Sequence, residues 1–209
     1  MLAKMMEATM TLSSAALPFL YNRDEIVALA DDYWKEIHER DANAERLFEN
    51  AFLEARSHGH LSKDLFISVA RWKSVRNTRN YELNTEAEIR TATSAAFQAS
   101  DDEASINALR ELHGVALRTA SAILHWMHPD RFPILEYRVM AALGETAPKS
   151  YENIRLYTRI ADRIRELALH HSLDLRTIDR ALWTWDKRRS PKLKPRCRKR
   201  RSELDEEPA

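Results

Sequence analysis

Glycine is scarce in this chain, with only three in 209 residues. Glycine is the residue that supplies positive backbone angles in tight turns and close approach to bound phosphates. The sequence contains neither GxGxxG nor GxxxxGK, so nucleotide-binding folds that depend on such loops are excluded. No stretch of useful length alternates between apolar and polar residues, and we therefore expect no substantial β-sheet.

Cysteine and long apolar runs are also rare or absent. The single cysteine, Cys197, excludes a disulfide framework and a thiolate zinc site, and it favours a reducing, cytoplasmic location. No apolar run approaches the length of a membrane span, and Glu7 interrupts the faint likeness of the first 20 residues to a signal peptide. The pairs His125/His128 and His58/His60 lack a third ligand at suitable spacing, so we expect no metal site.

Charge is distributed unevenly along the chain, although the net charge is only +1. Residues 187–201 contain ten Lys or Arg and no acidic residue, whereas the last eight residues contain four acidic ones. The rest of the chain is net acidic, which weakens a nucleic-acid interpretation because phosphate contacts usually supply much of the affinity. The basic segment is either a solubilising extension or a nonspecific DNA-binding arm; truncation at residue 189 would weaken DNA binding only in the second case.

Helical periodicity is found almost throughout, and the predicted fold class is all-α. Helix starts are indicated by Asn22, Ser62, Asn84 or Thr85, a capping box of Ser100 with Glu103, and Asp174. In the helix expected at 44–55, Leu47, Phe48 and Phe52 should face inward. The segment 77–84 is expected to be a loop, and 131–135 to be extended around Pro133. The helices are expected at about 23–40, 44–55, 63–76, 85–98, 101–112, 117–127, 137–143, 150–170 and 175–187.

Three regions follow from this pattern: a flexible N-terminal segment at 1–21, a helical domain at 22–189, and a disordered tail at 190–209 that is basic and then acidic.

The stretch from Leu112 to Val139, LHGVALRTASAILHWMHPDRFPILEYRV, carries the clearest functional signal. It reads as a helix end, a tight turn containing Gly114, a second helix rich in small residues, and a proline-bounded segment that ends at Glu136. Backbone N–H groups at the start of the second helix would form a site for an anion such as DNA phosphate.

This stretch resembles the helix-hairpin-helix DNA glycosylase superfamily. The family pattern is roughly Leu-Pro-Gly-Val-Gly, then Thr-Ala, then an acidic residue about 18 to 20 positions later. The residues that match are Leu112, Gly114, Val115, Thr119, Ala120 and Glu136. The resemblance implies a two-lobed helical domain with the hairpin at the interlobe cleft, and double-stranded DNA as the partner of a monomer.

The resemblance also assigns roles to residues. Glu136 stands where the family has its catalytic aspartate. Arg118 stands where bifunctional members have a Schiff-base lysine, and since a guanidinium stays protonated, it favours a monofunctional, water-using enzyme. Ala116 replaces the second glycine of the hairpin. The residues expected to bind DNA at the hairpin are His113, Gly114, Val115, Ala116, Arg118 and Thr119. The family implies no organic cofactor, although a monovalent cation at the hairpin is compatible with it.

A basic cluster lies earlier in the chain. Arg71, Lys73 and Arg76, interleaved with Trp72, could contact the DNA backbone and provide a stacking surface. Trp72, Trp34 and Tyr137 are candidates for a base pocket. Both tryptophans could equally belong to the apolar core.

The expected function is therefore excision of a modified base from DNA, either in repair or in defence against modified phage DNA. Two alternatives stay open: a helix-hairpin-helix protein that binds DNA without chemistry, and a helical module that binds protein or RNA. A purely structural interpretation also fits, with Gly114 as a helix C-cap, Thr119–Ala122 as a packing face and Glu136 paired with Arg118 or Arg138.

Overall fold

The computed structural model describes residues 18–145 and 153–190, and it is all-helical, with no strand among these residues. Two 3₁₀ segments, η1 and η2, accompany the α-helices. The elements are η1 (Pro18–Tyr21), α2 (Arg23–Glu36), α3 (Glu39–His58), α4 (Lys63–Lys73), η2 (Val75–Asn77), α5 (Thr78–Glu82), α6 (Glu86–Gln98), α7 (Asp102–Arg110), α8 (Leu117–Met127), α9 (Tyr137–Ala142), α10 (Ile154–His171) and α11 (Leu175–Arg189). The all-α prediction is confirmed.

Most helices begin at a polar residue whose side chain accepts hydrogen bonds from the first exposed backbone amides. Asn22, Ser62 and Asp174 cap α2, α4 and α11, as the sequence predicts. Thr85 and Glu88 form a reciprocal capping box at α6. The capping box predicted for Ser100 and Glu103 is wrong: Asp101 is the cap of α7, and its side chain accepts from the amide of Ala104 at 2.7 Å.

Other local expectations are also corrected. Leu47 was expected to face inward, but it is 70 % exposed, because the buried stripe of α3 runs through Ala42, Glu45, Phe48 and Phe52 instead. The predicted loop at 77–84 contains the end of η2 and the short helix α5, which buries Tyr81 completely. The start predicted for α10 at residues 150–151 lies outside the described residues, and the described helix begins after the cap Asn153.

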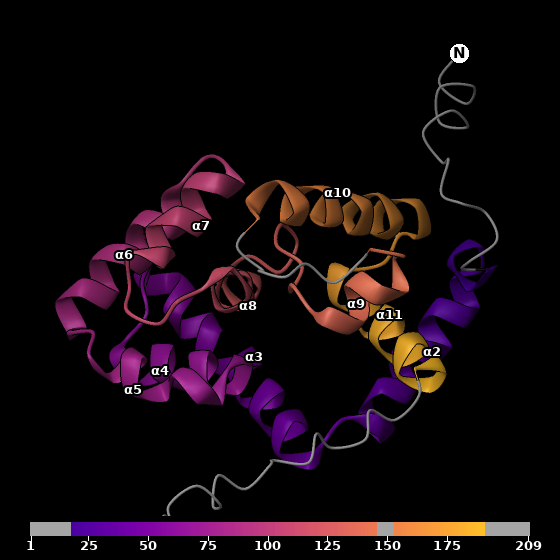
Figure 1. Cartoon of the computed structure of the whole chain (residues 1–209), viewed down its shortest axis with the longest axis horizontal. Helices are drawn as coiled ribbons and strands as arrows, with labels where there is room; N and C mark the ends of the chain where they lie inside the picture. Colours follow the sequence, from indigo (N-terminus) through magenta and orange to yellow (C-terminus); the bar gives the residue numbers. More distant parts are fainter. Residues whose placement is uncertain (1–17, 146–152, 191–209) are drawn as a thin grey trace, which may run out of the picture.

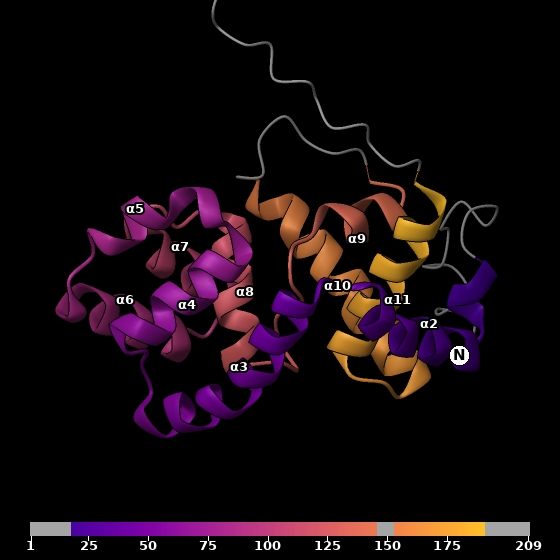
Figure 2. The same cartoon turned by 90° about the horizontal axis from the view of Figure 1, so that it is seen from below.

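The helix α8 is central to the packing. It contacts α3, α4, α6 and α7, whereas α11 contacts α2, α9 and α10. Figures 1 and 2 show α4 to α7 on one side of α8, and α2, α9 and α11 on the other. Because α8 has neighbours on most of its circumference, ten of its eleven residues are buried.

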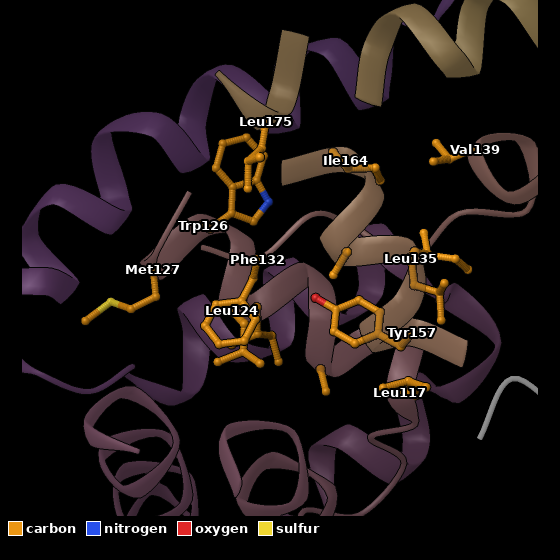
Figure 3. Packing of buried hydrophobic residues seen from close by; sticks show 14 of the residues in the cluster. Leu117, Leu124, Trp126, Met127, Phe132, Leu135, Val139, Tyr157, Ile164 and Leu175 are labelled. Carbon is orange, nitrogen blue, oxygen red and sulfur yellow. The ribbon is translucent and has the colours of Figure 1, made fainter. Parts of the chain in front are cut away.

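A continuous apolar core joins these helices. Figure 3 shows the part in which side chains of α8 meet those of the segment before α9 and those of α10. The labelled members are Leu117, Leu124, Trp126, Met127, Phe132, Leu135, Val139, Tyr157, Ile164 and Leu175. None of the described helices has the length and apolar content needed to cross a membrane.

Candidate functional site

The segment between α8 and α9 begins with a turn at 129–131 and continues through 132–136 without regular structure, and its backbone is fixed by side chains from two helices. Arg131, which was expected to belong to an extended run, lies in this turn. His125 Nδ1 donates to the carbonyl of Phe132 at 2.8 Å, and Ser121 Oγ accepts from the amide of Leu135 at 3.0 Å. From α10, Tyr157 donates its hydroxyl proton to the carbonyl of Pro133 at 3.0 Å. The segment therefore ends at a fixed position, and that position is Glu136.

His125 keeps this arrangement independent of pH over the usual range. It is 2 % exposed, and burial lowers the pKa of His125 to about 3. The neutral imidazole has one N–H, and its contact with a carbonyl oxygen places that proton on Nδ1. The bond between α8 and the segment before α9 therefore persists throughout the neutral range.

Glu136 is the N-cap of α9, and its two carboxylate oxygens have different partners. Oε1 is in an ion pair with the ammonium group of Lys73. Oε2 accepts from Arg118 Nη2 at 3.3 Å and from the amide of Tyr137 at 3.3 Å. The side chain of Glu136 is 28 % exposed and that of Arg118 is 37 % exposed, so the group is partly open to solvent.

Lys73 occupies the buried side of the group. It is the last residue of α4, and its side chain is only 2 % exposed. Burial lowers the pKa of Lys73, and the nearby charge of Glu136 offsets part of that effect. Burial alone would raise the pKa of Glu136, but the charges of Lys73 and Arg118 reverse this and lower it. The carboxylate is therefore held in its ionised form.

A second carboxylate, Asp179 of α11, interacts electrostatically with Lys73 and Glu136. It is 2 % exposed, and its Oδ2 is in an ion pair with Arg176. Burial raises the pKa of Asp179, while the charges of Arg176 and Lys73 oppose that effect. Among the described residues, Oδ1 of Asp179 accepts no hydrogen bond. The two carboxylates that share the field of Lys73 thus have pKa values shifted in opposite directions.

Arg176 continues the ionic network into the interior. Glu45 of α3 is completely buried, and it accepts from Arg176 at 2.6 Å, from Arg180 at 3.1 Å and from the hydroxyl of Tyr33 at 2.5 Å. Burial would raise the pKa of Glu45, but the two arginines lower it. This network joins α2, α3 and α11, and the ion pair of Arg176 with Asp179 connects it to the second carboxylate.

The turn between α7 and α8 is held by asparagine side chains. The amide nitrogen of Asn84 donates to the carbonyl of His113 at 3.1 Å, and its oxygen accepts from the amide of His113 at 2.7 Å. Asn77 donates to the carbonyl of Gly114 at 3.2 Å. Gly114 has φ +81°, which glycine adopts far more readily than other residues.

The start of α8 follows this turn directly. Ala116 is its N-cap, with φ −95° and ψ 169°, which is ordinary extended backbone. Alanine at position 116 therefore needs no positive backbone angle. Ala116 has no polar side chain, so no side-chain cap occupies the N-terminal end of α8.

The residues predicted to form the site are only partly brought together. Lys73, Arg118 and Glu136 are in contact, and Tyr137, which is 42 % exposed, is adjacent. In the turn between α7 and α8, His113 is exposed, whereas Val115 is buried. Thr119 is 2 % exposed, and its hydroxyl pairs with that of Tyr81 at 3.2 Å, so its side chain faces the interior.

The basic cluster divides in two. Arg71 and Arg76 are exposed, while Lys73 points inward to Glu136. Trp72 is partly buried and packs edge-on against Phe48 and Trp126, with ring centroids 5.7 and 6.1 Å apart.

Trp34 has different neighbours from those of Trp72. It lies against the guanidinium groups of Arg180 and Arg46, at 4.3 and 5.4 Å from its ring centroid. Its contacts therefore belong to the interior network around Glu45 rather than to the group around Glu136.

Several contributors could not be identified from the sequence. Lys73 and Glu136 are 63 residues apart, and Asn84 and His113 are 29 apart, so no local pattern connects them. No group of three or more histidine, cysteine or acidic side chains suited to a metal ion occurs in the described residues. Comparison with protein-family models, with curated proteins and with solved structures finds no match.

Proposed function

We propose that the protein is a monofunctional DNA glycosylase that removes a modified base by hydrolysis. The observation that carries the proposal is the position of Glu136: an ionised, partly exposed carboxylate at the start of α9, in contact with Arg118 from the first turn of α8. In this proposal, α7, the Gly114 turn and α8 are the helix-hairpin-helix, and the helices on either side of α8 are two lobes with the DNA between them.

The chemistry suits an ionised carboxylate. Breaking the bond between the base and C1′ of the sugar develops positive charge on the sugar, which a nearby carboxylate stabilises. Water then adds its oxygen to C1′, and its proton leaves through the carboxylate or the departing base. Arg118 cannot serve as a neutral amine, and Lys73 is 2 % exposed beneath Glu136, so water is the nucleophile.

DNA binding would use groups near the carboxylate. The N-terminal end of α8 favours a phosphate, and the exposed Arg71 and Arg76 flank Trp72 and Lys73 in the chain. Tyr137 offers an exposed ring next to Glu136 for stacking with a base.

A second candidate function is DNA binding without chemistry. The observation that favours it is that two cations, Lys73 and Arg118, face one carboxylate. Such a group is well suited to a phosphate, and its positive charge opposes the developing positive charge of the sugar.

The test is incubation of the protein with duplexes that carry different modified bases, followed by mass spectrometry of the released bases. Glu136→Gln keeps the size of the side chain and removes its charge, so base release should fall by about a hundredfold or more while DNA affinity changes little. Glu166→Gln, on the exposed face of α10, is the matched control and should keep full activity. The product should be an abasic site in an uncut strand.

Two results decide between the candidates. Undiminished base release by Glu136→Gln would show that Glu136 is not the catalytic carboxylate. DNA binding without release from any modified duplex would support the non-catalytic candidate.

A further inference from the structure

Lys73 is the least exposed of the charged groups that contact Glu136, and no role in the proposed reaction requires its ammonium group to meet the substrate. Its side chain is 2 % exposed, against 37 % for Arg118. It reaches Glu136 from the C-terminal end of α4, a helix that packs against α8. Such a buried ion pair is costly to form, because both groups lose water, and it therefore invites a functional explanation.

The two carboxylate oxygens of Glu136 are held differently, so they are not equivalent. Oε1 is bound to the buried ammonium group of Lys73. Oε2 has two longer contacts at 3.3 Å, one to the half-exposed Arg118 and one to the amide of Tyr137. Contacts at that length are weak, and Arg118 can exchange its partner with little cost because its charge is already partly solvated.

We propose that Lys73 is the positioning residue of Glu136, fixing Oε1 in the interior so that Oε2 is the oxygen presented to the substrate. This inference rests on the proposed function, because that function supplies the substrate. The anchoring of Oε1 by Lys73 can be tested without it. Arg118 then acts as an exchangeable partner of Oε2, and it leaves that oxygen when DNA supplies a phosphate.

The electrostatic surroundings agree with this assignment. The groups that act on Glu136 are Lys73 from α4, Arg118 from α8 and the amide of Tyr137 from α9, while Asp179 of α11 adds a repulsive carboxylate. The charge of Lys73 is the largest of the effects that lower the pKa of Glu136, ahead of that of Arg118. Removing Lys73 should therefore affect the ionisation of Glu136 more than removing Arg118.

The experiment compares matched variants by titration. The full-length protein is labelled with ¹³C at the side-chain carboxyls of glutamate, and the signal of Glu136 is assigned as the one lost in Glu136→Gln. Lys73→Met keeps an apolar stem in the buried position but removes the charge, and it should raise the pKa of Glu136 by roughly one unit or more. Lys73→Arg restores a cation and should keep the pKa low, while Arg118→Met should raise it less than Lys73→Met.

The control is Lys63→Met, which removes a partly exposed lysine whose Nζ bonds only the carbonyl of Glu82 among the described residues. If Lys73→Met does not fold, as judged by circular dichroism, Lys73→Gln takes its place with the same expectation. An unchanged pKa of Glu136 in the Lys73 variants, or a larger rise in Arg118→Met, would overturn the proposal.

Base release supplies an independent readout. Since the ionised form of Glu136 is the active one, the acid limb of the pH–rate profile should move to higher pH in Lys73→Met and return in Lys73→Arg. If Lys73 had only a structural role, Lys73→Met would lower the rate without moving the acid limb. That result would also contradict the proposal. If no variant and no wild-type protein releases a base, the proposed function fails while the titration still decides the role of Lys73.

Discussion

Replacing Gly114 by alanine tests how the turn before α8 is built. Gly114 has φ +81°, and a Cβ atom added there would lie 2.7 Å from Cβ of Asn80 and 3.1 Å from the ring of Tyr81. Cβ of Asn80 is attached directly to the backbone of α5, and Tyr81 is completely buried, so neither neighbour can move away easily. Two separate costs are therefore expected, one from the backbone conformation and one from the steric contact.

The chain contains controls that separate these costs. Gly59 and Gly144 also have positive φ values, +71° and +75°, but an added Cβ would meet no atom within 4 Å in the described part of the chain. Gly59→Ala should destabilise the protein by about 1 kcal/mol through the left-handed conformation alone. Gly114→Ala carries the same cost plus overpacking of about 1 to 3 kcal/mol, so its total should be about 2 to 4 kcal/mol.

The measurement is urea unfolding followed by circular dichroism, with Gly114→Ala, Gly59→Ala and Gly144→Ala compared at equal slope. If Gly114→Ala is no more destabilising than Gly59→Ala, the close contact with Asn80 and Tyr81 does not exist in solution. The packing of Gly114 against α5 would then be wrong.

Two further predictions concern buried polar groups. Asn84→Ala removes the side chain that bonds both backbone groups of His113, so it should cost about 2 to 3 kcal/mol of stability. A loss of less than about 1 kcal/mol in urea unfolding would contradict a stabilising role of these two hydrogen bonds. Glu45→Gln leaves Arg176 and Arg180 without their shared carboxylate and should cost about 3 to 5 kcal/mol. Because the pKa of Glu45 is lowered in the folded protein, its contribution to stability is present above the usual pKa of a glutamate and is lost as the pH falls through the folded value. Unfolding curves of wild type and Glu45→Gln should therefore converge at strongly acidic pH, and a constant difference down to that pH would contradict the assignment.

The helices could be predicted where local chemistry determines them. The caps Asn22, Ser62 and Asp174 act on amides two or three residues away, so the sequence alone contains the relevant information. The bounds of α8 agree with the prediction because Gly114 precedes it and His128-Pro129 follows it. At Leu47, periodicity failed because an ionic residue, Glu45, takes a buried place that the pattern assigns to an apolar one.

The candidate site was less accessible to such reasoning. The position of Glu136 at the start of a helix follows from Pro133 and local pattern. Its partners do not, because Lys73 comes from another helix and its inward direction depends on how α4 packs against α8. The sequence groups Lys73 with Arg71 and Arg76 as one basic cluster, yet residues two apart on a helix point in different directions.

The packing of α2 against α11 has a consequence for the synthesis of the chain. Arg188 binds Asp32 at 2.7 Å and Glu36 at 2.6 Å, so the first and the last described α-helices form one unit. At about 5 to 20 residues per second, roughly 8 to 30 s separate the end of α2 from the end of α11 during translation. Throughout that interval Ile26 and Tyr33 lack their contacts with α11. The nascent chain therefore exposes the apolar face of α2 near its beginning. Ribosome-bound chains that stop before residue 175 should therefore be cut by proteases within α2, and chains extended past residue 189 and clear of the exit tunnel should resist.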